Sequence, residues 1–115
     1  METAAENGAR LVRNELLFRE VNEQIERLGT STGAAVVEKI DFLCECVDVS
    51  CTSLIAMTLD EYEAIRRVPT HFFAVPGHEY PPIERVVEET VDYVVLEKSG
   101  NAGEKAAAAD PRARR

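Results

Sequence analysis

All three cysteines of this 115-residue chain lie within a stretch of eight residues, as Cys44, Cys46 and Cys51. Thiolates are preferred ligands of structural zinc, which four sulfur or imidazole ligands usually hold in a tetrahedron. In an extended segment Cys44 and Cys46 point to the same side of the backbone, so both sulfurs can reach one ion if the chain bends directly afterwards. The spacing therefore predicts three ligands of one metal site, and the fourth ligand must come from elsewhere in the chain.

Two histidines are available as the fourth ligand, His71 and His78. His78 follows Pro76-Gly77 in an expected turn just past an apolar segment, and from a turn its side chain can point back at the cysteines. His71 opens the same apolar segment and suits a surface position equally well. We therefore favour His78, which gives a Cys3His zinc site of a known structural class.

Two carboxylates beside the expected ligands, those of Asp48 and Glu79, are candidates to accept a hydrogen bond from the imidazole N–H of His78. Asp48 and Ser50 are also suited to stabilise the turn within the cysteine cluster through hydrogen bonds from side chain to backbone.

Other interpretations of the cysteine cluster stay open. Three thiols and an imidazole can also hold an iron–sulfur cluster. Alternatively, Cys44 and Cys46 are ordinary small buried side chains. That interpretation is disfavoured because Cys46 and Cys51 lie among the polar residues Glu45, Asp48 and Ser50. Among metals, this ligand set favours zinc.

The sequence predicts that the protein is not an enzyme. Four protein ligands would close the coordination sphere, whereas a catalytic zinc keeps one position open for water. Glu45 and Glu79 flank expected ligands, but in an extended backbone their side chains would point away from the metal. The sequence motifs of zinc deaminases, of Ser/His/Asp hydrolases and of phosphate-binding loops are absent.

The elements that must position the ligands indicate an α+β fold. Apolar and β-branched runs predict strands at residues 40–43, 53–57, 71–75, 83–90 and 93–98. Thr58 and Glu61 match a capping box that opens a short helix, which ends near Arg67 before Pro69. Residues 83–90 also fit a helical period, but a strand there gives 93–98 a hairpin neighbour. We expect a small, mostly antiparallel sheet with one short helix, stapled by the metal site.

Upstream, the sequence predicts a long amphipathic helix over residues 10–28. Its apolar stripe repeats at steps of three and four residues, with Asn14 on the same line, and consists of Leu11, Phe18, Val21, Ile25 and Leu28. Such a stripe suits two roles equally well: docking on the chain's own domain, or pairing with a protein partner or a second copy in a homodimer. The remaining domain boundaries are predicted as follows: 1–9 disordered, 29–39 a linker, 40–98 the zinc-binding α+β domain, and 99–115 a disordered tail.

Charge and hydropathy exclude two classes of partner. The net charge is −8, and residues 40–98 hold twelve acidic and four basic side chains, so the surface would repel a phosphate backbone and nucleic-acid binding is not expected. No apolar run approaches the roughly 20 residues that cross a bilayer, and the N-terminus lacks the layout of a signal peptide. We expect a cytoplasmic protein, in which clustered thiols serve as metal ligands or redox groups rather than disulfide partners.

The chain resembles a family of small, uncharacterised bacterial proteins over roughly residues 14–98. The shared pattern comprises FLCEC at 42–46, Cys51, TLDEYE at 58–63, PTHF at 69–72, VPGHE at 75–79, IERVVE at 83–88, and the segment 93–98. The resemblance implies that the cysteines and His78 belong to a common framework. In the family the position of His71 is commonly Arg, which also supports His78 as the ligand. The resemblance implies no particular activity.

These observations lead to one main functional hypothesis and two alternatives. The main hypothesis is a structural zinc site in a protein that acts through protein–protein contact, with a regulatory role. The first alternative is a zinc-thiolate redox sensor, in which oxidation of the thiols would eject the metal. The second is a metal-dependent enzyme, which would need an open coordination position beside Glu45 or Glu79.

Overall fold

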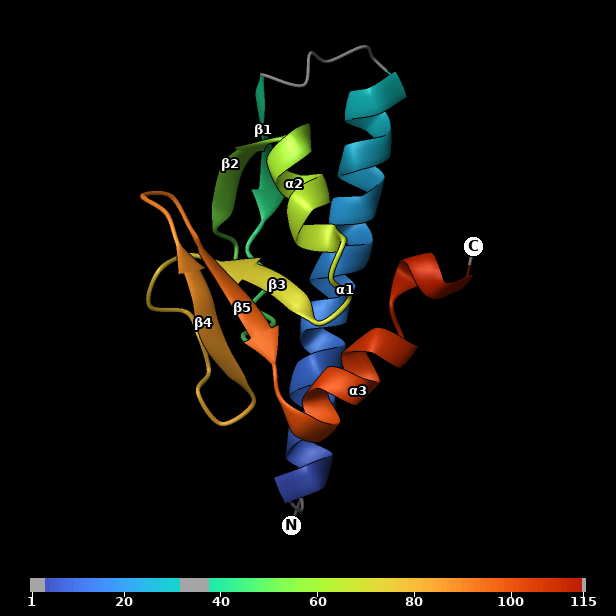
Figure 1. The fold of residues 1–115 in the computed structure, drawn as a ribbon, viewed down its shortest axis with the longest axis vertical. Helices are drawn as coiled ribbons and strands as arrows, with labels where there is room; N and C mark the ends of the chain where they lie inside the picture. The colour runs from blue at the N-terminus through green and yellow to red at the C-terminus, as the bar shows by residue number, and fades with distance from the viewer. Residues whose placement is uncertain (1–3, 32–37, 115) are drawn as a thin grey trace.

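The computed structural model describes residues 4–31 and 38–114 of the chain (Figure 1). Its elements in chain order are α1 (Ala4–Ser31), β1 (Lys39–Leu43), β2 (Leu54–Thr58), α2 (Leu59–Arg66), β3 (His71–Ala74), β4 (Glu84–Glu89), β5 (Val94–Lys98), α3 (Gly100–Ala108) and the 3-10 helix η1 (Pro111–Arg114). The predicted α+β class with a long N-terminal helix is confirmed. Among the described residues, no helix combines the length and the apolar character needed to cross a membrane.

The strands form two small antiparallel sheets that lie along the same side of α1 (Figure 1). β1 and β2 pair as a hairpin around the cysteine segment, with Lys39 opposite Thr58 and Leu43 opposite Leu54. The second sheet has the order β3-β5-β4, and the predicted hairpin of β4 with β5 is present. Glu45 joins the two sheets, because its backbone N–H donates to the carbonyl of Phe73 at 2.9 Å.

A small aromatic core lies where the two sheets meet α2. Phe42 and Tyr62 stack with ring centroids 4.4 Å apart, and Phe73 meets both rings edge-on. All three side chains are fully buried. The predicted capping box fixes the start of α2, since the Thr58 hydroxyl accepts from the Glu61 N–H while the Glu61 carboxylate accepts from the Thr58 N–H.

The long helix α1 buries a largely polar face. This face is displaced by about one residue from the apolar stripe that the sequence predicted to be the contact side. The face toward the sheets is formed by Val12, Glu15, Arg19, Asn22 and Glu23, each at most 1% exposed. Buried charged side chains are tolerated only where partners satisfy them, and the described structure supplies ion-pair or hydrogen-bond partners to all four of the polar ones.

The predicted stripe, Leu11, Phe18, Val21, Ile25 and Leu28, therefore does not form the seam against the domain. Leu11, Phe18 and Ile25 are half-buried, while Val21 and Leu28 are 46% and 65% exposed. The helix is docked on its own domain, and much of its apolar surface faces outward. The role of this stripe in binding a partner stays a prediction.

Three predicted boundaries need correction. Residues 4–9 belong to α1, as do residues 29–31 of the predicted linker; residues 1–3 and 32–37 lie outside the described part of the chain. The predicted disordered tail was wrong: residues 100–114 form α3 and η1.

The C-terminal segment docks because small residues and paired charges replace a large apolar face. A Cβ at Gly103 would lie only 2.9 Å from the carbonyl oxygen of Lys98, so the small residue lets α3 approach β5 closely. Beyond α3, Asp110 receives two hydrogen bonds from the buried guanidinium of Arg66, at 2.6 and 3.0 Å. Arg112 then reaches Glu23 on α1 at 2.8 Å.

A second buried ion cluster lies nearer the N-terminal end of α1, around Glu15. The ammonium of Lys98 on β5 contacts the carboxylates of Glu15 on α1 and Glu84 on β4, and all three side chains are fully buried. Burial raises the pKa of Glu15 well above its ordinary value. Buried charges therefore tie α1 to the second sheet through Glu15, and to α2 and η1 through Glu23. Apolar side chains of α1 also pack on the core.

The docking of the C-terminal segment, α3 and η1, can be tested by removing the carboxylate of Asp110. We expect Asp110→Ala to lower the free energy of unfolding by about 3–5 kcal/mol, because the variant leaves the Arg66 guanidinium buried without its partner. Urea denaturation of the full chain measures the change. Glu104→Ala, at an exposed position of α3, is the matched control and should be nearly neutral. Equal stability of the two variants would contradict the docked tail.

Candidate metal centre

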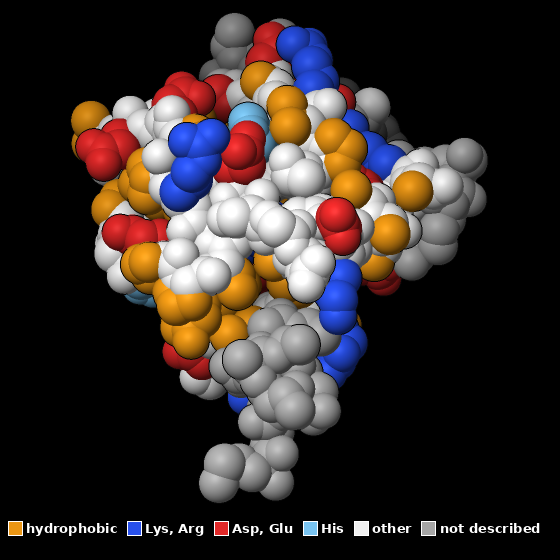
Figure 2. All heavy atoms as spheres, turned by 60° about the horizontal axis from the view of Figure 1, so that its bottom comes forward, with side chains coloured by type: hydrophobic (Ala, Val, Ile, Leu, Met, Phe, Trp, Pro, Cys, Tyr) orange, Lys and Arg blue, Asp and Glu red, His pale blue; other side chains and the backbone are white. Residues whose placement is uncertain are grey.

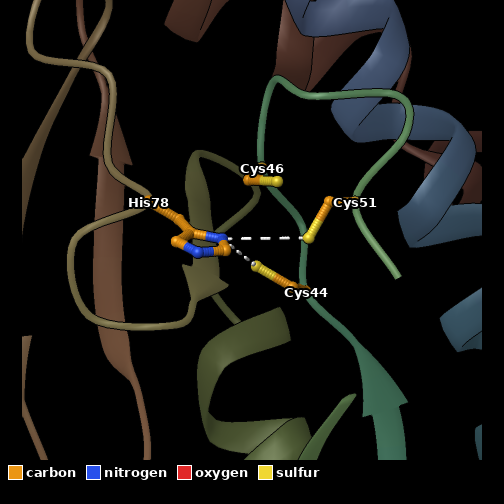
Figure 3. Close-up of side chains that lie close together, drawn as sticks. All are labelled: Cys44, Cys46, Cys51 and His78. Atoms are coloured by element: carbon orange, nitrogen blue, oxygen red, sulfur yellow. Dashed lines mark hydrogen bonds between the residues drawn. The ribbon is translucent and has the colours of Figure 1, made fainter. Parts of the chain in front are cut away.

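The structure brings the four predicted ligands together. The ligand atoms of Cys44, Cys46, Cys51 and His78 all lie within 4.8 Å of one another. His78 Nδ1 is 3.5 Å from the sulfur of Cys44 and 3.8 Å from that of Cys51. Figure 3 shows the three sulfurs and the imidazole pointing toward a common centre, with the histidine coming from a different loop.

These separations fit a tetrahedral zinc site. Zinc–sulfur and zinc–nitrogen bonds of about 2.3 and 2.0–2.1 Å at tetrahedral angles place sulfur and nitrogen about 3.6 Å apart. The distances from His78 Nδ1 to the sulfurs of Cys44 and Cys51 lie close to that value. The four side chains thus need little rearrangement to surround one ion.

The polar face of α1 determines how the cysteine segment lies. Asn22 both donates to the carbonyl of Leu43 at 2.9 Å and accepts from the Leu43 N–H at 2.7 Å. Asn14 donates to the carbonyl of Val47 at 3.1 Å. Residues 43, 45 and 47 therefore contact the helix, and the alternate residues Cys44 and Cys46 are directed to the other side, where the ligand cluster lies.

Glu45, between the two cysteines, is anchored by Arg19. The Arg19 guanidinium donates to the Glu45 carboxylate at 2.9 and 3.4 Å, and Asn22 donates to it at 3.0 Å. Arg19 also lies 3.6 Å from the ring centroid of Phe72 and donates to the carbonyl of His71. Both charged side chains are completely buried. As predicted, Glu45 points away from the ligand cluster.

A tight turn delivers the third cysteine. The Asp48 carboxylate accepts from the N–H and the hydroxyl of Ser50, at 2.9 and 2.7 Å. The Cys51 N–H donates to the Asp48 carbonyl at 3.0 Å and closes the turn. This confirms the predicted role of Asp48 and Ser50 in the turn.

A second turn, after β3, delivers the histidine. Gly77 has a φ of +94°, a conformation that favours glycine, and the His78 N–H donates to the Val75 carbonyl at 2.9 Å. The Glu79 carboxylate accepts from the Gly77 N–H at 2.9 Å. Val75 also donates its N–H to the Cys44 sulfur at 3.3 Å, which links this turn directly to the cysteine segment.

The structure separates the remaining candidates from the ligand cluster. His71 Nε2 lies 3.1 Å from a carboxylate oxygen of Glu97, across β3 and β5, and is not part of the cluster. The hydrogen bonds described for Asp48 and Glu79 lie within their own turns. Their role as acceptors for the imidazole stays a prediction.

The thiols influence one another's ionisation. A hydrogen bond from Cys44 lowers the pKa of Cys46 to about 5. The same hydrogen bond, together with burial, raises the pKa of Cys44 well above its ordinary value. A second negative charge in this half-buried cluster is thus unfavourable on its own, and a bound dication would offset it.

The sequence did not predict that polar side chains of α1 would anchor the cysteine segment through hydrogen bonds. Arg19 and Asn22 are polar, and in the sequence they read as the solvent-facing side of an amphipathic helix, whereas Asn14 lies on the apolar stripe. The sequence signal that could have indicated these contacts was Asn14, a polar residue within the apolar stripe.

Comparison with known proteins gives no match: no protein-family model, no curated protein and no solved structure is similar to this chain. The resemblance to a bacterial family therefore stays a prediction. The site has to be interpreted from its own geometry.

The contribution of α1 to the ligand cluster can be tested with a variant that removes none of the four ligands. If the cluster binds a metal, we expect Asn22→Ala to weaken the affinity for added zinc about tenfold, because Leu43 loses its anchor beside Cys44. This is the lower end of the effect of residues that orient ligands. Competition with a chromogenic chelator measures the affinity. Gln24→Ala, at an exposed position of the same helix, is the control. Unchanged affinity in a folded Asn22→Ala variant would contradict this role of the helix.

Proposed function

We propose that Cys44, Cys46, Cys51 and His78 bind one zinc ion whose role is structural. The observation that carries the proposal is the convergence of three sulfurs and one imidazole nitrogen within 4.8 Å. A set of four protein ligands leaves no position for water or substrate, which supports a structural site over a catalytic one. We therefore propose that the protein is not an enzyme.

The position of the cluster supports this role. Its cysteines belong to the segment between β1 and β2, and its histidine follows β3, so the ion would join the two small sheets. Buried ion pairs and hydrogen bonds attach α1 to the rest of the domain, together with a few apolar contacts. Small domains of this kind commonly depend on a metal for part of their folding free energy.

Metal content is the direct test. We expect protein purified without chelator to contain about one equivalent of zinc and to unfold at a lower temperature once the metal is removed. Elemental analysis and thermal unfolding measure the two effects. Cys51→Ser and His78→Ala should each lose most of the zinc, because each lacks one of the four ligands.

His71→Ala is the matched control, since His71 is the other histidine and lies outside the cluster. It should retain zinc as the wild type does. A wild-type protein that takes up no zinc during refolding in its presence would overturn the proposal.

We further propose that the protein acts through protein–protein contact and not on nucleic acid. Three large apolar side chains on the outer face of α1, Leu17, Val21 and Leu28, are 46–65% exposed, which supports a contact surface there. On the face shown in Figure 2, acidic and basic side chains are interspersed and form no continuous basic patch. Free thiols in the cluster suit a reducing compartment such as the cytoplasm.

Redox sensing is a second candidate function, favoured by the exposure of one ligand. Cys51 is half-exposed and follows an exposed turn, whereas Cys44 and Cys46 are buried. Oxidants therefore have a route to one sulfur. Hydrogen peroxide would take two electrons from two thiolates, which join as a disulfide, while the peroxide is reduced to water. The ion would lose two of its four ligands and leave.

A peroxide titration distinguishes a sensor from a purely structural site. A sensor should release zinc at micromolar peroxide, and added thiol reductant should restore binding; a chromogenic chelator reports the released metal. The same titration with catalase present is the control. Zinc that stays bound until peroxide reaches millimolar concentration would exclude the sensor and leave the structural site unaffected.

A further inference from the structure

We infer that a pocket between α2 and the second sheet binds a short aliphatic diamine in its doubly protonated form. The pocket has a volume of about 290 Å³. Ala64 and Ile65 of α2 and Val95 of β5 form the apolar part of its lining. None of the four proposed metal ligands lines it, so the inference goes beyond the proposed function and does not depend on zinc.

The hydroxyl groups of the lining already use their donors within the protein. The Tyr93 hydroxyl donates to the Glu61 carboxylate at 2.8 Å, and the Thr90 hydroxyl donates to the backbone carbonyl of Tyr93 at 2.9 Å. The ionised carboxylates of Glu61 and Glu88, which also line the pocket, can only accept hydrogen bonds. Hydroxyl and carboxylate oxygens are therefore left as acceptors, and a ligand that binds here has to supply the donors.

The described lining of the pocket is also negatively charged. It contains the carboxylates of Glu61 and Glu88 and no lysine or arginine. Its histidine, His71, already lies with Nε2 3.1 Å from a carboxylate oxygen of Glu97. Two negative charges attract a cation, and burial of an aliphatic stem on the neighbouring apolar surface adds to its binding.

Tyr93 indicates that the two carboxylates act on one space. Burial, the hydrogen bond to Glu61 and the charges of Glu61 and Glu88 raise the pKa of Tyr93 above its ordinary value. The hydroxyl therefore stays neutral at pH 7, and its lone pairs remain available to an ammonium group. A cation beside this hydroxyl is attracted by both carboxylates.

Size and charge select a diamine among the possible cations. Protein pockets for small molecules usually start at about 300 Å³, so this pocket suits a ligand of few atoms. A diamine offers one ammonium group to each of the two carboxylates and places its aliphatic stem on the apolar part of the lining. A metal ion has no such stem, and the described residues that could jointly hold an ion do not include Glu61 or Glu88.

A nuclear magnetic resonance titration of the full chain with butane-1,4-diamine tests the inference. We expect the backbone amide signals of Glu61, Tyr93 and Val95 to shift and to saturate with a dissociation constant in the millimolar range, because Glu88 is exposed and exposed ion pairs are weak. Butylamine, with one ammonium group, should bind about fivefold more weakly. The uncharged butane-1,4-diol should not bind. Absence of a saturable shift with the diamine, or equal affinity for either of the other two compounds, would overturn the inference.

Two neighbouring glutamates of β4 separate this site from a general attraction of cations to an acidic protein. Glu88→Gln removes a carboxylate of the lining and should weaken diamine binding about fivefold. Glu89→Gln removes the same charge from the next residue, which is exposed and lies outside the lining, and should leave binding unchanged. Equal effects of the two substitutions would count decisively against the pocket.

Filling the apolar part of the pocket gives a second test that keeps both carboxylates. Ala64 is exposed on α2 and leucine is a good helix former, so Ala64→Leu should fold normally while it occupies the space of the stem. We expect this variant to show no saturable shift, and normal diamine binding would contradict the inference. N-acetyl-lysine methylamide represents the lysine side chain of a partner protein. Tighter binding of this probe than of the diamine would overturn the choice of a free diamine.

Discussion

The buried pair of Arg19 and Glu45 is the contact on which the arrangement of the cysteine segment depends. Glu45 lies between two cysteines, and its carboxylate is held by Arg19 and Asn22 from α1. Because side chains alternate along an extended chain, fixing Glu45 on the helix side directs Cys44 and Cys46 to the opposite side. A buried ion pair contributes little net stability, since desolvation offsets much of the attraction. Its value here is specificity: it selects one register for the segment.

Charge pairing supplements the apolar core in holding several elements together. α1 is tied to the second sheet through Lys98, to α2 through Arg66 and to the C-terminal segment through Arg112. Removing a single partner would leave a buried charge unsatisfied, and such a loss costs far more than the intact pair contributes. These ion pairs act together with one hydrophobic cluster, to which α1, both sheets, α2 and α3 all contribute. A metal that joins the two sheets fits the same principle of a few strong, specific links.

The polar inner face of α1 leaves its apolar side chains available for other contacts. In most amphipathic helices the apolar stripe faces the core, but here the cysteine segment requires hydrogen-bond donors and acceptors instead. Leu17, Val21 and Leu28 consequently remain on the surface. Anchoring the cysteine segment and leaving these apolar side chains exposed are therefore two consequences of one helix orientation.

The sequence alone determined the features that depend on neighbouring residues. It predicted the strands, the capping box of Thr58 and the α+β class, because periodicity, β-branching and caps act over a few residues. It also predicted the ligand set, because three clustered thiols and a histidine in a turn have few other uses.

The tertiary structure alone decided which face of α1 is buried and whether the C-terminal residues are ordered. A buried charge is favourable only when its partner is in place, and here the partners are far apart in the chain, as Arg19 is from Glu45 and Arg66 from Asp110. Local patterns treat such residues as solvent-exposed, so they left open which face of α1 is buried, and they predicted a disordered tail. The information lay in pairs of residues that only the folded chain brings together.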